Sequence, residues 1–209
     1  MNRIGLVTWV VLMGILVTVG TAPAGQNGNG AFSGQQVLTA AEADNLVFLR
    51  EEEKLARDVY LYLFDVWGQW IFENISVSEQ QHMDAVKNLL DKYNLADPAA
   101  GKAEGEFLNE DLQGLYDELI AIGSESKLDA LYVGATIEDM DIVDLEQILE
   151  DTEKPDITRV CENLMTGSRN HLRAFVGQIE LLGETYAPQY LTPEEFDEIV
   201  NSPRENEPY

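Results

Sequence analysis

Cysteine is nearly missing from this chain, in which Cys161 stands alone among 209 residues. A single cysteine forms no intrachain disulfide and cannot build a cysteine-based zinc cluster. We therefore interpret Cys161 as a small, buried, apolar side chain. A chain of this length suits one domain plus a leader, and it can bury a sizeable hydrophobic core without such cross-links.

Basic side chains are also scarce. The chain has 13 lysines and arginines against 38 aspartates and glutamates, and its formal net charge is -25 at pH 7. Such a surface repels nucleic acid and anionic lipid, because binding to phosphate groups relies on basic side chains. We therefore expect no nucleic-acid partner, and we expect the protein to attract cations. Most of the acids are interpreted as a solvated face that keeps the protein soluble.

Several familiar sequence signals are missing as well. The chain has no Gly-x-Ser-x-Gly motif, no phosphate-cradling glycine loop and no dinucleotide fingerprint. Period-two alternation is rare, whereas apolar residues recur at helical spacing through most of the chain. The sequence thus predicts an all-α fold.

The N-terminus carries a long apolar run. Residues 4–19 read IGLVTWVVLMGILVTV, with Arg3 before them and Ala22-Pro23-Ala24 after them. This pattern is typical of a signal peptide over residues 1–24, with an uncleaved N-terminal anchor as the alternative. Either outcome predicts export to the periplasm, the cell surface or the medium, with membrane contact only if the leader is retained. Residues 25–38, rich in Gly, Asn and Gln, are expected to form a flexible tether.

Capping signals divide the rest of the chain into helices. Thr39 and Glu42 form a capping box, Gly68 suits a helix end, and the run TPEE at 192–195 is a second capping box. We expect a helical bundle over residues 39–185, followed by a short C-terminal helix and tail over 186–209. The expected helices span about 39–67, 72–93, 110–122, 124–150 (capped by Ser124), 155–182 and 192–200.

Four of these helices carry an inward stripe that is mainly apolar but polar near its middle. An antiparallel bundle buries residues that lie alternately three and four apart. The interruptions are Glu53 in the first helix, Glu79 and His82 in the second, Glu138 in the next long helix, and His171 in the last long helix. The two histidines are the only ones in the chain, and both fall at mid-height.

Buried carboxylates at one level are costly and repel each other unless cations neutralise them. Carboxylate oxygen and neutral imidazole nitrogen suit iron, manganese or zinc. The pattern therefore predicts a metal site in the bundle core that holds one or two ions, with iron or manganese favoured.

Other interpretations of these residues remain open at this stage. Glu52 and Glu53 belong to one acidic run, so the stripe does not choose firmly between them. Ser76 and Glu79 fit a capping box, in which case Glu79 would only cap a helix. Tyr60 is most simply a core aromatic, and a supporting role beside Glu53 is the alternative.

A metal-free bundle is a further alternative. The buried acids would then pair with Arg57, Arg169 and Arg173, and His82 would be a hydrogen-bonded core histidine.

The runs REEEKLARDVY, SEQQHMDAV, GATIEDMDIVDLE and GSRNHLRAF resemble a family of exported ferritin-like proteins, related to rubrerythrin and known only as a domain of unknown function. The resemblance covers residues 40–183. It implies a ferritin-like antiparallel four-helix bundle with short extra helices. Proteins of that fold hold two metals with one Glu from each of two helices and Glu-x-x-His from each of the other two. Glu53 and Glu138 match the single positions, and residues 79–82 match one Glu-x-x-His.

One position departs from the di-metal pattern. Ser168 precedes His171 by three residues where a fourth glutamate is expected. Asp141, one turn after Glu138, is a candidate to supply the missing oxygen, and Glu52 is another if the first helix is rotated. A single metal ion is the other solution.

The family resemblance implies no reaction, and the residues leave two expectations about function. The first is an iron- or manganese-dependent oxidoreductase that acts with oxygen, peroxide or ferrous iron. The second is a non-catalytic bundle of the cell envelope or medium that binds metal or a partner protein.

Overall fold

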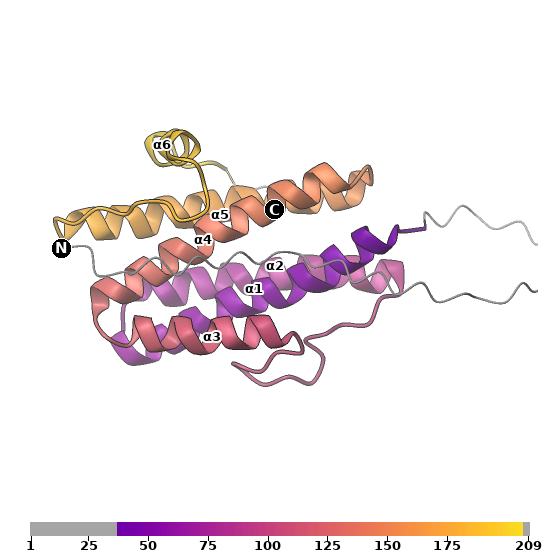
Figure 1. Ribbon diagram of the computed structural model, residues 1–209, viewed down its shortest axis with the longest axis horizontal. Coiled ribbons are helices and arrows are strands. Elements are labelled where there is room, and N and C mark those ends of the chain that lie inside the picture. The colour runs from indigo at the N-terminus through magenta and orange to yellow at the C-terminus, as the bar shows by residue number, and fades with distance from the viewer. Residues whose placement is uncertain (1–36, 207–209) are drawn as a thin grey trace, which may run out of the picture. The chain divides into compact units, whose positions relative to one another are not determined.

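The computed structural model describes residues 37–206, which form six α-helices and no strand (Figure 1). The prediction of an all-α fold is therefore confirmed. The predicted leader and nearly all of the predicted tether lie outside the described residues. The helices are α1 (Ala40–Trp67), α2 (Trp70–Tyr93), α3 (Glu110–Gly123), α4 (Lys127–Asp151), α5 (Pro155–Leu181) and α6 (Pro193–Asn201).

The ends of α1 follow directly from its sequence. Both halves of the capping box are present, because the Thr39 side chain accepts from the backbone of Glu42 and the Glu42 side chain accepts from the backbone of Thr39. At the other end Gly68 has φ 62°, a left-handed conformation that glycine adopts without steric cost. Only Gly68 and Gln69 separate α1 from α2, so the two helices pack as an antiparallel hairpin.

One alternative and one expectation about helix starts do not hold. The second helix begins at Trp70, so Glu79 lies well inside it, and the Ser76 hydroxyl instead donates to the Glu73 carbonyl. Ser124 closes α3 rather than capping α4, whose N-cap is Ser126. Ser126 takes that role because its side chain accepts from the backbone N–H of the residue three positions later.

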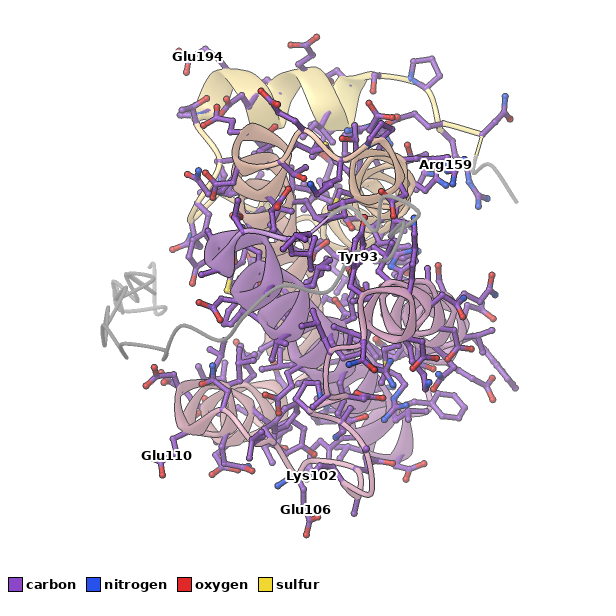
Figure 2. All side chains as sticks on the ribbon, turned by 90° about the vertical axis from the view of Figure 1, so that its right-hand side faces the viewer. Tyr93, Lys102, Glu106, Glu110, Arg159 and Glu194 are labelled. Carbon is purple, nitrogen blue, oxygen red and sulfur yellow. The ribbon has the colours of Figure 1, made fainter. Side chains whose placement is uncertain are left out.

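The long helices pack in two pairs, α1 with α2 and α4 with α5, and the pairs meet through α1 with α4 and α2 with α5. The shorter α3 packs on α1 and α4, while α6 packs on α5 (Figure 1). In the described part of the chain, no helix is apolar over enough of its length to cross a membrane. Acidic side chains such as Glu106, Glu110 and Glu194 project outward (Figure 2).

The apolar core has two clusters, one on each side of a polar layer. Leu46 and Leu49 of α1 belong to one cluster, and Leu55 and Val59 of the same helix belong to the other. The other long helices divide in the same way. The layer between the clusters is the level at which the charged side chains enter the interior.

The predicted inward stripes agree with burial except at the end of α5. The alternation predicts Gln178 and Leu182 as inward residues after Phe175, but both are exposed, and Ile179 is the buried residue there. The buried face steps four residues rather than three from Phe175 to Ile179, because a helix of 3.6 residues per turn does not keep to a strict alternation of three and four.

The charged run at the middle of α1 is buried and fixes the loop at residues 94–109. Arg50 pairs with Asp97 at 3.0 Å, and Glu51 accepts from the backbone N–H groups of residues 108 and 109. Lys54 pairs with Asp58, and Asp58 also accepts from the Gly105 N–H at 2.9 Å. Residues 50–58 of α1, the charged run, therefore have one side that holds the loop and another that faces the interior.

Candidate metal centre

The polar layer contains five buried side chains from four helices. Each is at most 9% exposed. They are Glu53 from α1, Glu79 and His82 from α2, Glu138 from α4 and His171 from α5. Helices α1, α4 and α5 each contribute one of these side chains from their inward stripe. Helix α2 contributes two, which lie three residues apart and therefore on the same face of the helix.

Glu79 lies at the centre of this group. Its Oε2 is 2.8 Å from Nδ1 of His82, and its Oε1 is 2.8 Å from Nδ1 of His171. On one side, Oε2 of Glu53 is 3.2 Å from the His82 Nδ1. On the other side, Oε2 of Glu138 is 3.4 Å from the His171 Nδ1. The arrangement is two groups of three ligands that share one carboxylate.

Each group has a geometry suited to a metal ion. Within Glu53, Glu79 and His82, and again within Glu79, Glu138 and His171, one ligand atom per residue lies within 4.8 Å of the others. Ligand atoms at about 2.0–2.2 Å from one ion lie about 3 Å apart, which matches the spacings seen here.

Unsatisfied polar atoms also point to a cation. Glu53 Oε1, Glu79 Oε1 and His171 Nδ1 are buried without a hydrogen-bond partner in the described residues, although the last two are only 2.8 Å apart. Buried polar atoms are nearly always hydrogen-bonded, so such orphans need an explanation. Ligand atoms that converge on a common point, rather than on each other, provide one. The residues present therefore fit a metal ion.

Burial and the two imidazoles set the pKa values of the three glutamates. Burial raises the pKa of Glu53 to about 7, although His82 opposes the shift. Burial also raises the pKa of Glu138, against His171. For Glu79 burial acts in the same direction, but His82 and His171 outweigh it and hold the pKa well below its usual range.

The pKa values of both histidines are raised. Burial would lower the pKa of His171, but Glu138 and Glu79 raise it to about 10. The pKa of His82 is likewise raised well above its usual value by Glu79 and Glu53, against burial. Since a ligating imidazole nitrogen must be unprotonated, metal binding here would release protons.

Two further residues position these ligands. The Tyr60 hydroxyl donates to Oε1 of Glu138 at 2.5 Å, so it supports Glu138 rather than Glu53. At Gly167 an added Cβ would lie 2.6 Å from Nε2 of His82, so only glycine lets that ring lie against α5. The sequence reasoning missed Gly167, and its only signal was a small residue beside the α5 stripe.

Asp141 is buried but belongs to neither ligand group, and its Oδ2 accepts from the Ser168 hydroxyl at 2.5 Å. Glu52 also belongs to neither ligand group. Burial, followed by Asp144 and Asp141, raises the pKa of Glu52 well above its usual value. The orientation of α1 therefore brings Glu53, and not Glu52, to the histidines.

The three arginines of the metal-free interpretation are engaged elsewhere. Arg57 binds Asp58 and Gln80, while Arg169 and Arg173 bind Glu205. Between residues 37 and 206, none of them forms an ion pair with a glutamate of the polar layer. The pairing of this alternative is not formed, because these side chains leave their helices on outward or loop-facing sides.

Comparisons with known proteins agree on the family and the fold. Residues 42–203 match a family described as an uncharacterized protein domain (DUF2202). The uncharacterized protein MJ0754 of Methanocaldococcus jannaschii is 52% identical over 171 residues, which are 82% of this chain and 92% of that protein. The crystal structure of hypothetical protein MJ0754 from Methanococcus jannaschii matches with a TM-score of 0.80 and 52% identity, over 81% of this chain and 97% of that one. None of these descriptions names an activity or a ligand.

Proposed function

The chain belongs to the family of uncharacterized DUF2202 domains, and from its buried polar layer we propose that it is an exported metal-binding protein with a ferritin-like antiparallel four-helix bundle. Glu53, Glu79, His82, Glu138 and His171 hold iron or manganese. The protein acts as an oxidoreductase with oxygen, peroxide or ferrous iron.

One observation carries the proposal, namely the position of Glu79 between two histidines. Its two oxygens each lie 2.8 Å from an imidazole Nδ1, and each histidine has a second glutamate beyond it. A carboxylate that presents one oxygen to each of two ligand groups is suited to bridge two ions. We therefore favour two ions over one.

The ions, when bound, supply the redox chemistry, and the protein's contribution is to hold and shield them. The five ligand residues lie in the middle turns of helices rather than in loops, which fixes their positions. Tyr60 orients Glu138, and Gly167 leaves room for the His82 ring. The apolar clusters on both sides of the layer limit solvent access to it.

Elemental analysis of the protein, purified without chelator, tests the proposal. We expect about two equivalents of iron or manganese in the natural sequence and little in Glu79→Gln. The matched control is Asp84→Asn, which changes an exposed carboxylate of the same helix and should keep its metal. One equivalent would indicate a mononuclear site, and no metal after reconstitution would refute the proposal.

Activity needs a separate assay. The metal-loaded protein is expected to consume peroxide or oxidise ferrous iron faster than a Glu79→Ala/His82→Ala variant. Equal rates would remove the oxidoreductase part of the proposal and leave metal binding intact.

A non-catalytic metal-binding module is the second candidate. It is favoured by Ser168, whose hydroxyl is hydrogen-bonded to Asp141 where a di-metal enzyme has a fourth glutamate. Tightly bound metal that is inert to oxygen and peroxide would support this candidate.

A further inference from the structure

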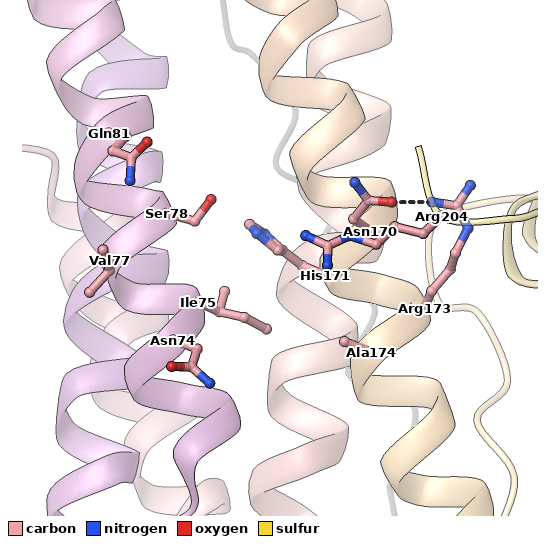
Figure 3. Close-up of a pocket in the computed structure, with 10 residues that line it drawn as sticks. All are labelled: Asn74, Ile75, Val77, Ser78, Gln81, Asn170, His171, Arg173, Ala174 and Arg204. Atoms are coloured by element: carbon pink, nitrogen blue, oxygen red, sulfur yellow. Dashed lines mark hydrogen bonds between the residues drawn. The ribbon is translucent and has the colours of Figure 1, made fainter. Parts of the chain in front are cut away.

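A pocket of about 480 Å³ opens between α2 and α5 beside the candidate metal centre (Figure 3). His171 belongs both to its wall and to the ligand group of Glu79 and Glu138. The imidazole thus separates the pocket from the buried carboxylates. A ligand in this pocket would therefore lie next to His171, on the α5 side of the polar layer.

The pocket is much larger than oxygen or peroxide requires. A water molecule occupies about 30 Å³ in the liquid, whereas sites for small organic molecules are about 300–1,000 Å³. The volume therefore fits a ligand of several atoms.

The charge of the lining is opposite to that of the protein. Acids outnumber bases 38 to 13 in the whole chain, yet the lining contains two arginines and no acid. Many of the other lining residues have neutral side chains that can donate hydrogen bonds, and a few have apolar side chains. The donors are Asn74, Ser78, Gln81 and Asn170.

The lining arginines come from two different segments. Arg173 is on α5 and is held by the carbonyl of Ile199, the side chain of Asn170, the Ser202 hydroxyl and Glu205. Arg204 comes from the segment after α6 and reaches the pocket beside Asn170 (Figure 3).

The segment after α6 is fixed on α5. The Glu205 N–H donates to the Asn170 side chain at 2.9 Å, and the Asn170 side chain donates back to the Glu205 carbonyl at 3.1 Å. The Glu205 carboxylate binds Arg169 and Arg173. Two guanidinium groups, those of Arg169 and Arg173, are therefore held by one carboxylate at this end of the pocket.

We propose that this pocket binds a small oxyanion, a carboxylate or a phosphate, beside His171. Guanidinium groups match the planar geometry of carboxylate and phosphate oxygens, and amide and hydroxyl donors complete such sites. Ile75 and Ala174 leave space for an apolar part of the ligand. That this ligand lies next to a bound metal rests on the proposed function. Its binding to the pocket does not depend on a metal.

The test is a titration of metal-depleted protein with inorganic phosphate and, separately, with acetate, followed by calorimetry. We expect saturable binding of at least one probe. Arg204→Gln should weaken it about tenfold or more, the usual effect of losing one charge-assisted hydrogen bond. Phosphate binding alone would identify a phosphate site, and acetate binding alone a carboxylate site.

Two variants make the test specific. Arg159→Gln removes the same charge from an exposed position on α5, about 16 Å or more along the helix from the pocket, and should bind like the natural sequence. Ala174→Leu fills the pocket without changing charge and should block binding. No saturable binding of either probe, or equal weakening by Arg204→Gln and Arg159→Gln, would overturn the proposal. Metal content, measured separately, reports on the proposed function alone.

Discussion

Gly167 decides where the His82 imidazole lies. In Gly167→Ala the new methyl group would meet the ring at 2.6 Å, and we expect the ring to move away from Glu79. Alanine favours a helix over glycine by about 1 kcal/mol, so a fall in helix stability would not explain the result. We predict at least a tenfold fall in metal affinity, measured by competition with a chromogenic chelator.

Gly177→Ala, on the same helix, is the matched control, since a Cβ at Gly177 would meet nothing within 4 Å. Unchanged metal affinity in both variants would show that His82 does not hold the metal.

Tyr60 supports the centre from the opposite side. Its hydroxyl donates to Glu138, and loss of such a supporting hydrogen bond typically costs 10–100-fold in metal affinity. We predict a loss of about that size for Tyr60→Phe in the same competition assay. Tyr62→Phe removes a hydroxyl that contacts Ser124 instead, and it should leave the affinity unchanged.

At the scale of the element, α1 combines two tasks within one charged run. Lys54 and Asp58 are almost fully buried, and removing one partner of a buried ion pair typically costs about 3–5 kcal/mol. Asp58→Ala also removes the acceptor of the Gly105 N–H. We predict a loss of about that size in the free energy of unfolding, measured with urea. The control Asp65→Asn, exposed on the same helix, should change it by less than about 0.5 kcal/mol.

The docking of the last segment on α5 should depend on pH. Arg169, and then Arg173, lower the pKa of Glu205 to about 2, against burial. A depressed folded-state pKa stabilises the fold above the unfolded value of about 4.3, and this contribution is lost as pH falls toward 2. We predict that Glu205→Gln lowers the free energy of unfolding at pH 6 and that its difference from the natural sequence narrows between pH 5 and pH 3. A constant difference across that range would contradict the ion-pair account.

At the scale of the whole molecule, the polar layer divides the core into two apolar clusters. A metal that binds only the folded state adds about 2.7 kcal/mol at 100 times its Kd. We therefore predict that a strong chelator lowers the melting temperature and that added iron or manganese restores it. A melting temperature insensitive to chelation would favour the metal-free bundle.

The sequence by itself determined the helices and the level of the polar layer. Capping residues such as Thr39 and Gly68 act locally, and inward stripes follow from helix periodicity, so both are legible without a structure. The five ligand candidates fell on these stripes, and the structure brings their side chains together. Their binding of metal stays a prediction.

Only the tertiary structure decided the remaining questions, because each depends on how one helix is turned toward another. The rotation of α1 presents Glu53 rather than Glu52, and the packing of α5 brings Gly167 to His82. The central position of Glu79 depends on two helices at once. The pocket combines α2, α5 and the segment after α6, three segments distant in sequence, so no local pattern could predict it.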